Sequence, residues 1–139
     1  MNKGEEMSDV LKFSIPGKPE YVQMVRLAIA SIAGKANFDV DAVEDIKAAV
    51  AEACKIVFCH GSEGFSTCYE IICEIEADSM TITASDACSG HDLVKSSKPC
   101  DICPGEGDIA VAVMESLMDS VAVEIDKDGN KNIRMVKNK

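Results

Sequence analysis

Two pairs of potential metal ligands lie close together in one short segment. Cys88 and His91 are separated by two residues, Cys100 and Cys103 by another two, and eight residues lie between the pairs. Thiolates and imidazoles at such spacing are typical of tetrahedral zinc sites, and thiolates also hold iron–sulfur clusters. The pattern therefore predicts a metal site with these four ligands, which would hold zinc or an iron–sulfur cluster and order the segment around it.

The seven cysteines of the chain also permit a plainer interpretation. Their odd number and the lack of a secretory signal favour reduced thiols over a disulfide framework. Cys54, Cys68 and Cys73 fall in expected helix and strand positions, so we predict that they are small core residues. A redox pair of Cys100 and Cys103 is a further alternative, although no βαβ pattern surrounds it.

Charge and composition exclude several classes of protein. The formal net charge of the 139 residues is −10, which repels nucleic acid phosphates and anionic lipids. No apolar run is long enough to cross a bilayer, and residues 1–9 are polar, so we expect a flexible tail there rather than an export signal. We therefore expect one cytoplasmic domain over residues 1–139 that binds neither nucleic acid nor membrane.

Apolar residues recur at helical spacing in three stretches. The first helix is expected to open at Pro19 and stop near Gly34. The second is expected to run from Asp39–Asp41, whose carboxylates supply capping oxygens, to about Cys59. The third is expected to span Ile109–Met118.

Alternating and β-branched residues predict strands between these helices. The expected strands are Val10–Ile15, Ser66–Ile75, Met80–Ala84, Val121–Ile125 and Ile133–Val136. Residues 87–108, rich in Gly, Ser, Pro and Cys, are expected to form a long, lid-like loop. This order predicts an α+β fold, a two-layer sandwich in which a mixed, mostly antiparallel sheet carries the helices on one face.

Three segments together resemble one protein family. The chain contains, in order, IPGKPEYVQMVRLAIASIA, VEDIKAAVAEAC and VMESLMDSV. These phrases are similar to those of the anti-sigma-factor serine kinases, which control bacterial stress and sporulation sigma factors. That family has the histidine-kinase-like ATPase fold, which gyrase and the Hsp90 chaperones share. The resemblance covers nearly the whole chain and implies a single domain of this type over residues 1–139.

The resemblance assigns roles to two positions of the second helix. In the family, a Glu acts as general base toward the attacking hydroxyl, and an Asn four residues later holds Mg²⁺. Here Glu52 stands at the base position and Ile56 at the Asn position, one helical turn apart on the same face. Isoleucine has no side-chain oxygen to offer Mg²⁺, which requires near-octahedral oxygen ligation. We therefore expect catalysis to be impaired.

The adenine motif of the family, an Asp followed by glycines, matches the segment after the strand Met80–Ala84. Asp86 stands where the Asp of the family accepts the adenine amino group, and Gly90 matches the second glycine, but Cys88 replaces the first. The resemblance thus implies an adenine pocket at Asp86 and Gly90 with a more crowded backbone approach. A plain turn after a strand is the alternative role for Asp86.

A glycine-containing segment precedes the third helix, where the family binds phosphates with backbone N–H groups. Gly105 and Gly107 are the candidate phosphate-binding residues, while Ala110 replaces another family glycine. Asp108 is placed to cap the helix, so that its carboxylate would occupy the position of a phosphate. At a separation of ~4 Å and an effective dielectric of about 20, two like charges repel by about 4 kcal/mol. The sequence therefore predicts a weakened triphosphate site.

The resemblance implies a regulator that sequesters a sigma factor, is released by an anti-anti-sigma protein, and forms a homodimer as family members commonly do. Because positions 56, 88 and 110 depart from the family, we expect protein binding with weak or lost ATP binding. Two alternatives stay open. One is an active serine kinase of the anti-anti-sigma partner, with Glu52 as base and Asp86 or Asp108 as a displaced Mg²⁺ ligand. The other is a metal-binding or redox-sensing regulator that uses the lid cysteines.

Overall fold

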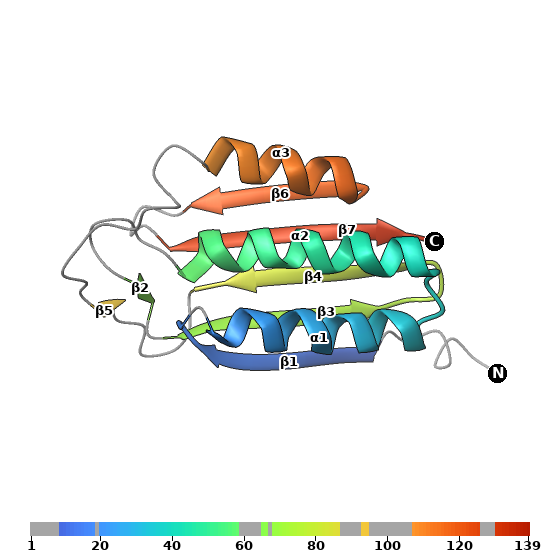
Figure 1. Cartoon of the computed structure of the whole chain (residues 1–139), viewed down its shortest axis with the longest axis horizontal. Helices are drawn as coiled ribbons and strands as arrows, with labels where there is room; N and C mark the ends of the chain where they lie inside the picture. The colour runs from blue at the N-terminus through green and yellow to red at the C-terminus, as the bar shows by residue number, and fades with distance from the viewer. Residues whose placement is uncertain are drawn as a thin grey trace.

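The computed structural model describes residues 9–18, 20–58, 65–66, 68–86, 93–94, 107–125 and 130–139. Along the chain a first strand is followed by two helices, a group of strands, a third helix and a closing pair of strands, as the sequence predicts (Figure 1). The elements are β1 (Asp9–Pro16), α1 (Glu20–Lys35), α2 (Val40–Phe58), β2 (Phe65–Ser66), β3 (Cys68–Ile75), β4 (Ser79–Ser85), β5 (Leu93–Val94), α3 (Gly107–Leu117), β6 (Ser120–Ile125) and β7 (Lys131–Asn138).

Five strands form one sheet in the order β1-β3-β4-β7-β6, and every neighbouring pair in it is antiparallel. The helices lie together on one face of this sheet, with α1 in front of β1 and β3, α2 in front of β4 and β7, and α3 beside β6 (Figure 1). This arrangement confirms the α+β sandwich that the sequence predicts. The expected mixed sheet is antiparallel throughout these five strands.

The core lies between the sheet and the helices because both layers turn an apolar face inward. Strand residues on this face recur at every second position and helix residues at every third or fourth. The strands contribute Tyr69, Ile71, Cys73, Met80, Ile82, Ala84, Ile133 and Met135, and the two longer helices contribute Val25, Ile29, Ala33, Ile46, Val50, Ala53 and Val57. Within the described ranges, no helix is both long and apolar enough to cross a membrane.

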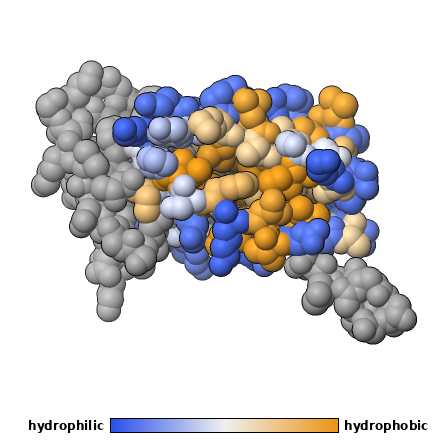
Figure 2. All heavy atoms as spheres, turned by 90° about the horizontal axis from the view of Figure 1, so that it is seen from below, coloured by the Kyte–Doolittle hydropathy of each residue, from blue (hydrophilic) through white to orange (hydrophobic). Residues whose placement is uncertain are grey.

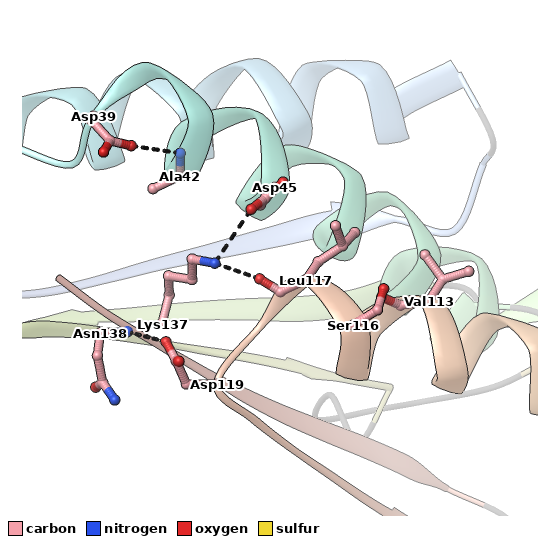
Figure 3. Close-up of polar contacts among 9 residues, drawn as sticks. All are labelled: Asp39, Ala42, Asp45, Val113, Ser116, Leu117, Asp119, Lys137 and Asn138. Carbon is pink, nitrogen blue, oxygen red and sulfur yellow. Dashed lines mark hydrogen bonds and ion pairs between the residues drawn. The ribbon is translucent and has the colours of Figure 1, made fainter.

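The turn between α1 and α2 is built from local backbone and side-chain contacts. Asn37 has a φ of 71°, the left-handed conformation in which many helices end. Phe38 N–H donates to the carbonyl of Ala33 at 3.2 Å, which satisfies one acceptor of the last turn of α1. Asp39 Oδ1 then accepts from Ala42 N–H at 2.8 Å (Figure 3), which confirms the predicted cap of the second helix.

Lys137 connects β7 to both neighbouring helices. Its Nζ donates to the carbonyl of Leu117 at 2.5 Å, at the end of α3, and lies 3.4 Å from Asp45 Oδ2 of α2 (Figure 3). A cation at a helix C-terminus is favourable because the last carbonyls lack helical partners. Asp119 Oδ2 accepts from Asn138 N–H at 2.6 Å, so the connection from α3 into β6 is held at two points of β7.

Two expected segment boundaries are wrong near the chain start and before the central hairpin. Asp9, expected in the tail of residues 1–9, opens β1 and pairs with Ile75. The strand expected over Ser66–Ile75 is divided into β2 and β3. Asp9 is in the strand because its backbone pairs with β3, and this pairing does not depend on an apolar side chain at position 9.

The region expected to be a loop over residues 87–108 also contains regular structure. β5 lies inside it and pairs antiparallel with β2, with Phe65 opposite Val94. α3 begins at Gly107, ahead of the expected start at Ile109. A pair of distant two-residue strands leaves no periodicity in the sequence, and the apolar spacing of a helix marks only its buried turns.

The two-layer arrangement predicts that truncating a buried and an exposed residue of α1 changes the free energy of unfolding by very different amounts. Ile29→Ala removes a side chain with 0% exposure, leaves a cavity in the core, and should lower the free energy of unfolding by about 2–5 kcal/mol. Leu27→Ala removes a side chain that is 54% exposed and should change that free energy by less than about 0.5 kcal/mol. Urea denaturation measures both. A large loss in Leu27→Ala, or none in Ile29→Ala, would contradict the assignment of the buried face.

Candidate functional site

Glu52, the predicted general base, lies in the C-terminal half of α2. Its side chain is 29% exposed, and its Oε2 is 3.5 Å from the Nζ of Lys55 one turn further along. An ion pair this exposed contributes little to stability. The carboxylate is therefore accessible at the surface of the helix.

Ile56 occupies the position at which the resemblance expects an Asn. Its side chain is partly buried and packs against the core. The carbonyl oxygen of Ile56 accepts a hydrogen bond from Lys131 Nζ at 2.9 Å. The side chain offers no oxygen and the carbonyl already holds an ammonium group, so this position does not fit a Mg²⁺ ligand.

Asp86 follows the last residue of β4 and has 0% exposure. Its Oδ1 accepts from the N–H of Lys131 at 2.6 Å, and its own N–H donates to the carbonyl of Lys131 at 3.1 Å. The pairing of β4 with β7 ends at Ser85 opposite Asn132, so these contacts extend the ladder by one step. The hydrogen bond from the Lys131 N–H lowers the cost of burying the Asp86 side chain, because a buried polar group needs a partner.

The described part of the chain brings two of the predicted site residues to one end of the sheet. Glu52 lies one turn from Ile56 on α2, Asp86 lies beside the first residue of β7, and Lys131 contacts both Ile56 and Asp86. Gly107, a predicted phosphate-binding residue, is the first residue of α3. The first N–H groups of a helix have no helical partners, so the start of α3 can face an anion.

The remaining predicted ligands lie outside the described residues. These are Gly90 and Gly105 of the nucleotide motifs and Cys88, His91, Cys100 and Cys103 of the metal motif. Among the residues that the structure describes, no group of three or more His, Cys, Asp or Glu side chains is arranged to hold a metal ion. The metal site and the phosphate loop therefore stay predictions from the sequence.

Lys131 is the site residue that the sequence analysis missed. It stands two and four residues before Ile133 and Met135, both of which have 0% exposure. Strand alternation therefore places this lysine on the helix-facing side of β7. In the sequence, Lys131 precedes Ile133 and Met135 at strand spacing, which could have indicated that it lies on the same face. The expected strand, however, began only at Ile133.

The described cysteines are only partly the core residues that the sequence predicts. Cys54 and Cys73 have 0% exposure, and burial raises the pKa of each thiol from its ordinary value of 9.0 to about 12. The prediction is wrong for Cys68, which is half-buried. Its position one residue before the buried Tyr69 places it on the opposite face of β3.

Burial predicts which of these thiols react with an electrophile. Because the thiolate is the nucleophile and the raised pKa keeps Cys54 and Cys73 protonated, the native protein should leave both unmodified by iodoacetamide at about pH 8. The denatured protein should be modified at both positions. Mass spectrometry after a short labelling pulse measures this. Modification of either residue in the native protein at the denatured rate would contradict the assignment.

The contact between Asp86 and Lys131 predicts a loss of stability when the acceptor is removed. Asp86→Ala should lower the free energy of unfolding by about 1–3 kcal/mol, since the Lys131 N–H loses its partner in a partly buried place. Asp86→Asn keeps an acceptor oxygen and should lose less. Glu52→Ala is the control and should change the free energy by less than about 1 kcal/mol. Equal effects in Asp86→Ala and Glu52→Ala, by urea denaturation, would show that the buried contact adds nothing.

Comparison with solved structures supports the architecture. The structure of the RsbU and RsbW domains of a Mycobacterium tuberculosis protein matches with a TM-score of 0.66 at 10% sequence identity. The match covers 94% of this chain and 32% of that one. At this identity the likeness shows the fold alone.

Comparison with known sequences shows the family. The serine-protein kinase RsbW of Bacillus licheniformis is 30% identical over 131 residues, which cover 86% of this chain and 80% of the relative. The serine-protein kinase RsbW of Listeria monocytogenes is 33% identical over 133 residues, which cover 87% of this chain and 83% of the relative. The family described as the histidine kinase-like ATPase domain matches residues 15–137. The chain therefore belongs to the histidine kinase-like ATPase domain family and is a homologue of the RsbW serine-protein kinases.

Proposed function

We propose that this protein is an anti-sigma-factor-like regulator that acts by binding partner proteins, with weak or lost ATP binding. Its homology to RsbW kinases over most of the chain supports a partner-switching role. In that role the protein holds a sigma factor until an anti-anti-sigma protein releases it. The same family background leads us to expect a cytoplasmic homodimer.

The residue at position 56 is the main reason to expect that phosphoryl transfer is lost. Phosphoryl transfer depends on cations that neutralise the charge on the transferring group. Ile56 supplies no side-chain oxygen for a divalent cation, and its carbonyl oxygen is bound by Lys131 Nζ at 2.9 Å. Asp86 does not offer a substitute, because its carboxylate has 0% exposure and accepts from Lys131 N–H. These contacts support binding without phosphorylation over an active kinase.

The surface of α1 and β1 supports a protein as the partner. Met24 and Leu27 of α1 are 60% and 54% exposed, and Val10 of β1 is 50% exposed. Figure 2 views the molecule from this side and shows apolar atoms gathered between polar borders. Contiguous exposed apolar surface on a soluble protein commonly marks an interaction site. The net charge of −10 suits a basic segment of a sigma factor.

Two other candidates remain as outcomes of the test. A kinase would still have the partly exposed Glu52 as its base. A metal or redox sensor would use Cys88, His91, Cys100 and Cys103, and stoichiometric zinc or iron in freshly purified protein would favour it.

The proposal predicts binding that does not depend on the candidate base. The purified protein is titrated against each sigma factor and each anti-anti-sigma protein encoded in the same genome, with ATP and Mg²⁺ present. Wild type and Glu52→Gln should bind the same partners with affinities that agree within about threefold, since no covalent step is involved. Neither should transfer phosphate to the anti-anti-sigma protein. Phosphoserine that forms with wild type and disappears with Glu52→Gln would establish the kinase instead.

Truncating an exposed apolar residue of α1 tests whether this surface binds the partner, with a matched control on α2. Leu27→Ala, which should leave stability unchanged, is expected to weaken sigma-factor binding by about tenfold. Val40→Ala removes a side chain that is 76% exposed at the start of α2, outside α1 and β1, and should leave binding unchanged. Failure of the wild type to bind any sigma factor would contradict the proposed function.

A further inference from the structure

Lys131 is held at three atoms by two segments that are distant in the chain. Its N–H donates to Asp86 Oδ1 at 2.6 Å and its carbonyl accepts from Asp86 N–H at 3.1 Å. Its Nζ donates to the carbonyl of Ile56 at 2.9 Å. The backbone contacts are with the end of β4, and the side chain runs from β7 to the C-terminal end of α2.

The position suits a lysine on both electrostatic and packing grounds. Strand alternation with Ile133 and Met135 directs the stem toward the helices, and Lys131 is itself partly buried. The ammonium group lies near the C-terminal end of α2, where carbonyls without helical partners carry partial negative charge. A partly buried lysine can keep its stem against the protein while its charged end donates to a carbonyl, here that of Ile56.

Asp86 is correspondingly closed to a ligand. Its side chain has 0% exposure, and one of its carboxylate oxygens already accepts from an amide of the same chain. An adenine amino group that is to donate to this carboxylate must first reach a group that solvent does not reach. Among the described residues, Lys131 contacts Asp86 through its backbone and reaches the carbonyl of Ile56 in α2 with its side chain.

We propose that Lys131 fills the subsite in which an adenine ring would meet Asp86, so that a nucleotide binds only after this side chain is displaced. This inference deepens the proposed function, because it rests on the assignment of Asp86 to adenine recognition and gives weak ATP binding a physical cause. The incoming ring must break the hydrogen bond from Lys131 to Ile56 and expel the lysine stem before it gains its own contacts. Lys131 is thus a specificity-determining residue that acts against nucleotides.

Calorimetric titration with ADP in EDTA tests the proposal on four proteins. Wild type should bind ADP only in the millimolar range or not at all. Lys131→Ala removes the stem and leaves the backbone contacts with Asp86, so its affinity for ADP should rise by about tenfold or more. Lys131→Met keeps a stem of similar length but loses the hydrogen bond to Ile56, so its affinity should lie between those of wild type and Lys131→Ala. Lys12→Ala removes an exposed lysine of β1 and is the matched control.

Two results would overturn the proposal. One is micromolar binding of ADP by wild type, and the other is equal affinity of wild type and Lys131→Ala when both are folded by circular dichroism. If Lys131→Ala does not fold, Lys131→Thr takes its place with the same expectation, because a short β-branched side chain suits a strand. Sigma-factor binding is measured on the same samples. Its absence in wild type would contradict the proposed regulator whatever the ADP titration shows.

Discussion

The pairing of β4 with β7 is the constraint on which the rest of the structure depends. It runs antiparallel from Ser79 opposite Asn138 to Ser85 opposite Asn132 and joins β1, β3 and β4 to β7 and β6 in one sheet. α2 lies in front of this central pair, so its apolar stripe is buried against both parts of the chain (Figure 1). The contacts between Asp86 and Lys131 continue the same ladder beyond the strand end. The site is therefore a direct extension of the pairing that closes the fold.

Local patterns accounted for most elements but not for the contacts of the site. The spacing of Val25, Ile29 and Ile32 predicts a helix, and Asp39 predicts a cap, because both signals lie within a few residues. The bonds from Lys131 to Asp86 and Ile56 join residues 45 and 75 positions apart, and no local rule contains them. For the same reason the pair of β2 with β5 was not foreseen. The family resemblance predicted that Asp86 follows a strand and that position 56 lies in the second helix, as the structure has them. It did not predict the contacts of either residue.

Membership in a family of ATPase domains leaves the chemistry of an individual chain to its side chains. The family match covers residues 15–137, while Ile56 and Asp86, to which the resemblance assigns a metal ligand and adenine, each form a hydrogen bond with Lys131. Lys131 donates to the carbonyl of residue 56 and pairs with Asp86 through its backbone. Such a site stabilises the strand ladder and helix end without a ligand, which suits a protein that works by binding other proteins.

The most direct test of this account is the Mg²⁺ dependence of ATP binding by the wild-type protein. Calorimetry with ATP in Mg²⁺ and in EDTA, on protein whose metal content has been measured, compares the two affinities. The account predicts no gain in affinity from Mg²⁺, because the position of Ile56 supplies no side-chain oxygen and its carbonyl is held by Lys131. Micromolar ATP binding that requires Mg²⁺ would contradict the loss of the metal site and would indicate an active kinase.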